Sequence, residues 1–347
     1  MTTEEKLAQA LRTIADRVEN QDVLSGVRVK RRRRTRRRTT GALAALCAVV
    51  LGWGVLVAWP SPGVVVEPAA PRAGSVERVW PQAVFILPKG SRPLTAISAT
   101  EVLVWNDRGT IEVYDAAAKR SRVVTALPQA PQYQAVDGDQ LLWLADGHAW
   151  VAPLRSVGRA RKVGSIAGEN VDRIALAGEY VVWSSPLEGV WRMRLGGGRP
   201  EQVARSKGLQ LVAWPWASDE PLDVRTNPTR VVNLQTGQTI KIRPLPGVEG
   251  LRCGPTWCAG TRGENTIVLR TDGSWSRVHR AGLRGYPYRE RLFPGSGEIY
   301  DARTDTTVTF EGARLETPGG RQWSGGAGVI FWPRDDGVVT VNLAAVP

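Results

Sequence analysis

The segment 284–291, with the sequence RGYPYRER, has the side chains of a ligand site. Tyrosine alternates with arginine here, and Tyr286, Tyr288, Arg289 and Arg291 could stack on a sugar ring or bind an anion. A degraded strand explains the same pattern equally well. The segment 215–228, PWASDEPLDVRTNP, is acidic and bounded by prolines. Ligands usually meet a domain at irregular loops of this kind, so both segments are candidates.

Acidic side chains recur in the predicted turns between apolar runs. Two carboxylates across a cleft are sufficient for glycan hydrolysis, and distant parts of a chain can supply them. If the strand register is right, these turns share one face of the domain. Turns are rich in Asp and Glu in any case, so this face is a place to search and not yet a site. The residues are Asp107, Asp146, Glu188, Glu264, Asp335 and Asp336.

Motifs of catalysis and metal binding are absent from the sequence. His148 and His279 are the only histidines, each within a predicted strand or at its edge. No HExxH, GxSxG, phosphate-binding glycine loop or EF-hand spacing occurs. We therefore expect no metal and no cofactor, and an enzyme is the third choice among the functions considered.

From about residue 78 onward, the chain predicts an all-β domain. Short β-branched and aromatic runs alternate with Gly, Pro, Asp and Asn turns, and no helical periodicity of useful length occurs. The runs repeat with a period near forty, because Trp105, Trp143 and Trp183 close similar runs at spacings of 38 and 40. A second apolar run follows each of them, at residues 109–115, 147–154 and 189–195.

Seven such units can be counted, and four strands per unit predict a seven-bladed β-propeller. The later units pair residues 229–235 with 239–242, 265–270 with 274–278, 297–302 with 306–310, and 328–332 with 337–343. The last unit lacks an outer strand. We predict that residues 79–87 (VWPQAVFIL) pair outside residues 338–343, so that an N-terminal strand closes the ring.

The strand pattern resembles WD-repeat-like and quinoprotein-like propellers, in which a turn of Asp-Gly character precedes a strand ending in Asp. Residues 106–109 (NDRG) and Asp115 carry this resemblance best. The whole plan is similar to single-pass, propeller-bearing membrane proteins of high-GC Gram-positive bacteria. The resemblance covers residues 78–347 and implies a fold and no activity.

Cys253 and Cys258 flank a predicted tight turn, CGPTWC, between the first two strands of the fifth blade. A CxxC-type redox or metal site is one interpretation, and a structural disulfide is the other. Four residues separate the cysteines instead of two, and no histidine is near in sequence. An oxidising compartment also favours the disulfide.

Residues 41–59 form an apolar run of nineteen residues, which as a helix would span about 28 Å, close to the thickness of a bilayer. A basic run at residues 28–38 precedes it. Nucleic-acid binding is one interpretation of such a run, but its position favours the positive-inside rule. A cleavable twin-arginine signal is the alternative to an anchor, but the segment is long and no clean cleavage site follows.

The predicted organisation has four parts. Residues 1–38 are a cytosolic arm, 39–60 a transmembrane anchor, 61–77 a proline-rich linker, and 78–347 the extracytoplasmic propeller. The arm holds 12 basic and 5 acidic residues, which is net +7 of the total +13. Its amphipathic helix could dock a cytosolic partner or lie on the membrane, through Leu7, Leu11, Ile14 and Val18.

These features predict a single-pass cell-membrane protein whose propeller binds an unknown extracytoplasmic ligand, without nucleic acid as a partner. In one version the arm holds a cytosolic regulator, as anti-sigma-like proteins do, and transduces a signal. In the second version the propeller is a cell-surface scaffold or carbohydrate-binding module. In the third it is a glycan hydrolase or lyase.

Overall fold

The computed structural model describes residues 66–67, 72–127, 130–131, 133–156, 159–166, 171–186, 188–280, 282–283, 285–295, 297–310 and 328–347. By its contacts the chain divides into two units, residues 1–61 and 62–347. The predicted arm, basic run and anchor lie outside the described residues. Within those residues, no helix has the length and apolar character needed to cross a membrane.

The second unit is built from antiparallel sheets that follow one another along the chain. Blade 1 contains β4 (Ser91–Ala96), β5 (Glu101–Asn106), β6 (Thr110–Asp115) and β7 (Arg120–Ala126). Blade 2 contains β8 (Gln134–Asp137), β9 (Gln140–Ala145), β10 (His148–Pro153) and β11 (Arg161–Ser165). Blade 3 contains β12 (Arg173–Ala177), β13 (Tyr180–Ser185), β14 (Gly189–Arg194) and β15 (Glu201–Gln202). Blade 4 contains β16 (Gln210–Ala213), β17 (Trp216–Ser218), β18 (Arg230–Asn233) and β19 (Thr239–Lys241).

The last three blades combine strands from both ends of the described chain. Blade 5 contains β20 (Glu249–Cys253), β21 (Trp257–Arg262), β22 (Asn265–Arg270) and β23 (Ser276–His279), with β1 (Val66–Glu67) outside. Blade 6 contains β24 (Leu292–Pro294), β25 (Glu298–Asp301) and β26 (Thr306–Thr309), with β2 (Arg72–Ser75) outside. Blade 7 contains β27 (Val329–Arg334), β28 (Gly337–Asn342) and β3 (Val84–Leu87).

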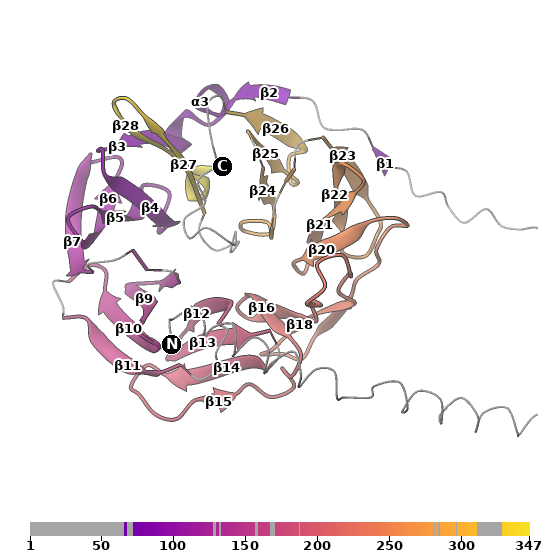
Figure 1. Ribbon diagram of the computed structural model, residues 1–347. Coiled ribbons are helices and arrows are strands. Elements are labelled where there is room, and N and C mark those ends of the chain that lie inside the picture. Colours follow the sequence, from indigo (N-terminus) through magenta and orange to yellow (C-terminus); the bar gives the residue numbers. More distant parts are fainter. Residues whose placement is uncertain are drawn as a thin grey trace, which may run out of the picture. The chain divides into compact units, whose positions relative to one another are not determined.

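These seven sheets form a closed ring, the seven-bladed β-propeller that the sequence predicts (Figure 1). A separate hydrophobic cluster fills each interface between neighbouring blades, including the one between blades 7 and 1. A blade thus buries both of its faces. This explains the continuous apolar runs, because a strand covered on both sides has no polar face to present. In β13, for example, Val181, Val182 and Trp183 are all buried.

The N-terminal closing strand is confirmed. Val338 of β28 pairs with Leu87 of β3, and Val341 pairs with Val84. The first half of the predicted strand is helical instead: α3 spans Val76–Val79, and the 3₁₀ turn η1 spans Pro81–Ala83. Proline lacks a backbone N–H and favours the start of a helical turn, which explains why the strand begins only after it.

Two short strands lie within the segment that the sequence analysis assigns to a linker. Strand β1 pairs in parallel with β23, and β2 pairs in parallel with β26. Each therefore adds a further strand to the outer edge of its blade. Next to β24 of blade 6, isolated antiparallel bridges join Leu283 to Gly295 and Tyr288 to Leu292. The final short element, the 3₁₀ turn η2, spans Leu343–Ala345.

Candidate functional site

A cavity of about 560 Å³ opens between blades 5 and 6, a volume in the range of small-molecule sites. Blade 5 contributes the start of β21, the end of β22 and the start of β23. Blade 6 contributes the turn before β24 and the turn between β25 and β26. The lining residues are Trp257, Arg270, Trp275, Arg277, Arg289, Glu290, Arg291, Ala302, Arg303 and Asp305. We call this cavity the inter-blade pocket.

A tight hairpin places three of these residues in the pocket. The backbone N–H of Tyr288 donates to the carbonyl of Leu292 (2.8 Å), and the reverse bond is 3.0 Å, so residues 289–291 form the tip. Arg289 and Glu290 both have positive φ, +50° and +58°. Two consecutive non-glycine residues in this region store backbone strain, which is common at functional sites.

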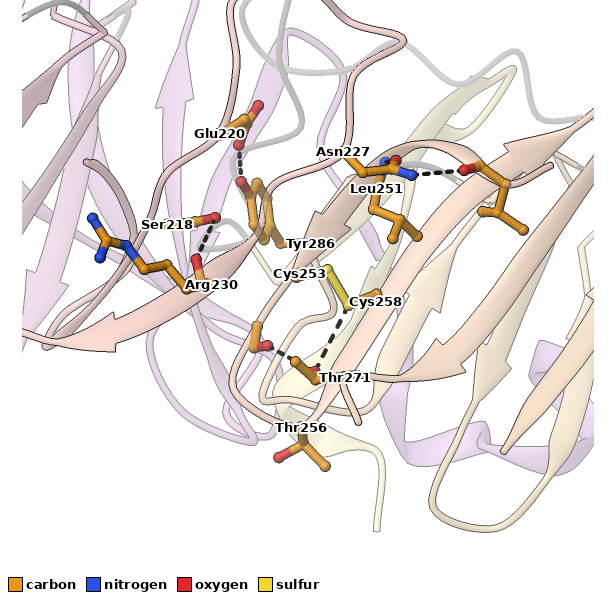
Figure 2. Close-up of a disulfide and its surroundings, with 12 residues drawn as sticks. Ser218, Glu220, Asn227, Arg230, Leu251, Cys253, Thr256, Cys258, Thr271 and Tyr286 are labelled. Atoms are coloured by element: carbon orange, nitrogen blue, oxygen red, sulfur yellow. Dashed lines mark hydrogen bonds between the residues drawn. A yellow bond between two sulfur atoms is a disulfide. The ribbon is translucent and has the colours of Figure 1, made fainter. Parts of the chain in front are cut away.

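The disulfide loop holds the side chain of Glu290. Cys253 and Cys258 are bonded and face each other across β20 and β21, which confirms the predicted disulfide (Figure 2). The backbone N–H of Thr256, inside this loop, donates to Glu290 Oε2 (3.3 Å). Thr271 ties the loop to blade 5 by donating from Oγ1 to the carbonyl of Gly254 (3.1 Å).

Two tryptophans and two of the arginines make up the blade 5 wall of the pocket. Trp257 and Trp275 meet edge to face, with ring centroids 5.3 Å apart. The Arg270 guanidinium lies 5.1 Å from the centre of the Trp257 ring, and that of Arg277 lies 5.4 Å from the Trp275 ring. Such stacking leaves the donors at the edge of the Arg270 guanidinium available to a ligand, whereas Arg277 is paired with Asp305.

The acids of the pocket differ in their environments. Asp305 is paired with Arg277 and accepts a hydrogen bond from the Tyr300 hydroxyl (2.9 Å). Burial raises the pKa of Glu290 to about 7, although the hydrogen bond from Thr256 lowers it in part. Glu290 can therefore exchange a proton near neutral pH.

Three arginines of the pocket are exposed: Arg270, Arg289 and Arg303. Within the described residues, none of the three has a carboxylate at ion-pair distance. Arg270 has one acidic neighbour in sequence, Asp272. The pKa of Asp272 is lowered mainly by hydrogen bonds from Ser274 and to a smaller extent by the charge of Arg270. Several guanidiniums converging on one cavity are suited to bind an anion, because each offers a planar fork of donors.

The predicted ligand residues of segment 284–291 separate into two groups. Arg289 and Arg291 line the pocket, although Arg291 also lies 3.7 Å from Asp301 and donates to the carbonyl of Val346 (2.9 Å). Tyr286 and Tyr288 are buried, at 3% and 8% exposure, and do not line the pocket.

Tyr286 belongs to a buried polar cluster that joins four blades. Its hydroxyl donates to Glu220, toward which it points in Figure 2, and the Arg173 guanidinium lies 4.1 Å from the centre of its ring. Arg252 Nη1 lies 2.8 Å from Glu220 Oε1. The acidic segment 215–228 thus supplies a structural carboxylate that compensates two buried guanidiniums.

The turns between the second and third strands of blades 1, 2, 3 and 5 hold Asp107, Asp146, Glu188 and Glu264, and the β27–β28 turn of blade 7 holds Asp335 and Asp336. Asp107 lines a smaller cavity of about 220 Å³, and Asp336 accepts two 2.6 Å hydrogen bonds from Arg334. Asp146 has φ +51° in its turn. A ligand role for Asp107, Asp146, Glu188, Asp335 and Asp336 stays a prediction. So does partner binding by Leu7, Leu11, Ile14 and Val18, which lie outside the described residues.

Sequence reasoning missed the aromatic and acidic parts of the pocket. Trp257 was seen only as part of CGPTWC, and Trp275 only as part of a strand. Glu290 lies inside the RGYPYRER segment, but nothing in the pattern marked it as buried. In the described part of the chain, no three His, Cys, Asp or Glu side chains are grouped to hold a metal.

The ring of blades and the inter-blade pocket define a β-propeller with a polar, arginine-rich cavity between two blades. No protein-family model matches the chain, and no curated protein matches it.

The chain is similar to several solved structures at low identity. Oligogalacturonate lyase from Vibrio parahaemolyticus is 8% identical with a TM-score of 0.49, and the match covers 76% of this chain and 92% of that one. YCF48 bound to D1 peptide is 9% identical with a TM-score of 0.46, covering 75% and 96%. The WD40 β-propeller domain of Doa1 is 12% identical with a TM-score of 0.43, covering 75% and 95%. Similarity at this level concerns the fold and carries no argument about activity.

Proposed function

We propose that the chain is a membrane-anchored, extracytoplasmic binding module that takes an anionic ligand in the inter-blade pocket. The observation that carries this proposal is the set of three exposed arginines, Arg270, Arg289 and Arg303, around one cavity, although Arg289 Nη1 also donates to the carbonyl of Ala344 (3.4 Å). With five arginines and two acids, the lining has a formal charge of +3 when both acids are ionised. The fold supports a binding or scaffold role, and the pocket favours binding.

The acids of the pocket favour binding over glycan hydrolysis. Hydrolysis needs two carboxylates that act on opposite sides of one bond. Asp305 is engaged by Arg277 and Tyr300, so it is occupied in a structural pair. Glu290 can exchange a proton, but the pocket offers no second unengaged carboxylate to act on the other side of the bond.

Membrane anchoring is the part of the proposal that rests on the sequence. The apolar run at residues 41–59 and the basic run before it support an anchor with the amino terminus in the cytosol. The disulfide between Cys253 and Cys258 is consistent with an oxidising compartment. A reporter enzyme that is active only outside the cytosol, fused after Pro347, is expected to be active in intact cells. The same reporter fused after residue 38 is expected to be inactive, and the reverse result would overturn the orientation.

The arm supplies the candidate route for a signal. We propose that its Leu7, Leu11, Ile14 and Val18 face holds a cytosolic regulator, as in anti-sigma-like proteins. Capture of a cytosolic protein by the full-length chain, lost in Leu11→Asp, would support the relay. A phenotype that survives deletion of residues 2–26 would instead favour the scaffold.

Ligand binding is tested on the full-length protein in detergent micelles. Sulfate and glucuronate serve as probes in isothermal titration calorimetry. We expect binding that weakens about tenfold or more in Arg270→Gln and in Arg303→Gln, because each removes a charged donor. Arg280→Gln is the matched control, since Arg280 is exposed on the same blade but does not line the pocket. Equal affinity in all four proteins would place the anion elsewhere.

A further inference from the structure

Glu290 is an isolated carboxylate inside an arginine-rich pocket. Five arginines line the same cavity, yet in the described part of the chain no guanidinium lies within ion-pair distance of Glu290. Its one hydrogen bond comes from the backbone N–H of Thr256, at 3.3 Å. Asp305, in contrast, has both an arginine and a tyrosine hydroxyl. The pocket therefore keeps one of its two acids unneutralised.

The surroundings hold Glu290 in this position from two sides. The hairpin tip is constrained by two consecutive positive φ angles, at Arg289 and Glu290. On the other side, the disulfide-closed loop presents Gly254 and Thr256 to the carboxylate. These contacts place the carboxylate in the cavity that an anion would enter. Its charge would then oppose the anion.

We propose that anion binding in the inter-blade pocket is linked to proton uptake by Glu290, so that the propeller binds its ligand more tightly as its surroundings become acidic. This inference rests on the proposed function, since it concerns the same site. As a carboxylate, Glu290 repels an anionic ligand. As a carboxylic acid, it becomes neutral and offers an O–H donor to the ligand.

The other charged groups that line the pocket are five arginines and Asp305. Arg289 and Arg291 lie on its own hairpin, Arg270 and Arg277 on blade 5, and Arg303 beside Asp305 on the β25–β26 turn. Arginine stays protonated near neutral pH. The buried ring of His279 has its pKa lowered to about 4 by desolvation and by Arg277, so it is neutral at the pH values of the test.

Glu290 is suited to such a linkage because burial raises its pKa to about 7. A bound anion raises this pKa further, and by thermodynamic linkage the proton strengthens anion binding by the same factor. If the bound anion raises the pKa by about 1.5, the affinity falls more than tenfold between pH 5.5 and pH 8.5.

The test uses sulfate, whose charge is constant over this pH range, so that any proton taken up is taken up by the protein. Affinity is measured by titration calorimetry at pH 5.5, 7.0 and 8.5 on the full-length protein in detergent. Repeating the pH 7.0 titration in buffers of different ionisation enthalpy counts the protons. For the unmodified protein we expect a loss of affinity of about tenfold or more with rising pH, and net proton uptake at pH 7.0.

Two variants locate the proton. In Glu290→Gln we expect an affinity that is independent of pH and close to the low-pH value of the unmodified protein, without proton uptake. Glu264→Gln, which changes an exposed acid in the β21–β22 turn of blade 5 outside the pocket lining, is expected to behave like the unmodified protein. Circular dichroism at each pH checks that both variants are folded.

The outcomes separate the two proposals. Sulfate binding that is independent of pH in the unmodified protein would overturn the proton linkage and leave the anion site intact. A pH dependence that persists in Glu290→Gln would also overturn it, by assigning the proton to another group. Absence of sulfate binding at every pH would overturn the anion site itself.

Discussion

The carboxylate of Glu290 rests directly on Gly254. Both of its oxygens lie 2.7 Å from the point where a Cβ of residue 254 would stand. Glycine is therefore needed at this position for the observed placement of Glu290. The contact joins the disulfide loop of blade 5 to the hairpin tip of blade 6, and it positions the Glu290 carboxylate at the pocket.

Gly254→Ala is expected to displace the Glu290 side chain and leave the fold intact. The atoms in the way are at the end of a flexible side chain, so the cost is the lost Thr256 hydrogen bond, about 1 kcal/mol. This cost should vanish when Gly254→Ala is made in a Glu290→Ala background. The measurement is urea unfolding of a double-mutant cycle, which consists of the unmodified protein, Gly254→Ala, Glu290→Ala and the double variant.

Gly189→Ala is the matched control for this cycle. Gly189 has φ +99°, and a Cβ there would meet the backbone carbonyl of Ser206. Its substitution is expected to cost more than about 1 kcal/mol, because backbone must move. Glu290→Ala should give no relief here. Relief of both substitutions by Glu290→Ala would contradict a direct contact between residues 254 and 290.

Opposing effects on the pH dependence of stability are expected from Glu290 and His279. The pKa of Glu290 is raised to about 7 in the folded state, so its contribution is present below about pH 4.5 and lost as the pH rises toward 7. The pKa of His279 is lowered to about 4, so its contribution is present above about pH 6.5 and lost as the pH falls toward 4. Each pKa difference corresponds to about 3 kcal/mol.

Single variants should separate these effects between pH 4.5 and 6.5. Glu290→Gln is expected to lose stability relative to the unmodified protein as the pH falls, because the His279 contribution is then unopposed. His279→Gln is expected to lose relative stability as the pH rises. Urea unfolding at pH 4.5, 5.5 and 6.5 measures both slopes. Parallel curves for all three proteins would mean that neither side chain changes its pKa on folding.

Reduction of the Cys253–Cys258 disulfide is expected to lower the free energy of unfolding by about 2 kcal/mol, the loop-closure value for so short a loop. It should also reduce the pH dependence of sulfate binding, since the loop holds Thr256 against Glu290. Thermal unfolding with and without a reductant tests this. The double variant Cys253→Ala/Cys258→Ala should not respond to the reductant, and an equal response would indicate an effect unrelated to the bond.

Leu87 of the closing strand should be far more sensitive to truncation than its neighbour Ile86. Leu87 is 1% exposed in the cluster between blades 7 and 1, whereas Ile86 is 40% exposed. Leu87→Ala is expected to lower the free energy of unfolding by roughly 2 to 5 kcal/mol, the range measured for other buried leucines. Ile86→Ala is expected to lower it by less than about 1 kcal/mol. Equal effects in urea unfolding would argue that β3 does not close the ring.

Local pattern was sufficient to predict several features of this protein. The runs ending in Trp105, Trp143 and Trp183 recur because every blade buries both of its faces. A strand that is buried on both faces needs a continuous run of apolar residues. The disulfide was predicted because four residues separate the two cysteines instead of two, no histidine is near them in sequence, and the predicted compartment is oxidising. The missing outer strand of blade 7 led to β3, because an unpaired edge requires a partner.

Other features depended on contacts that no local pattern encodes. Tyr286 and Arg289 stood in the same alternating segment, but the register of one hairpin buries the tyrosine under Arg173 and places the arginine at the pocket. The strands β1 and β2 escaped detection because they are short and add to the blades from outside.

By itself, the sequence determined the number of blades, their order, the closing strand and the disulfide, since each of these depends on neighbours in the chain or on a simple count of edges. The pocket was decided only by the tertiary structure. Its walls come from positions 257–305 on two blades, and the environment of Glu290 depends on Gly254 and Thr256 on the other blade. Burial and proximity across an interface set the pKa of a side chain, and neither is visible before the blades have packed.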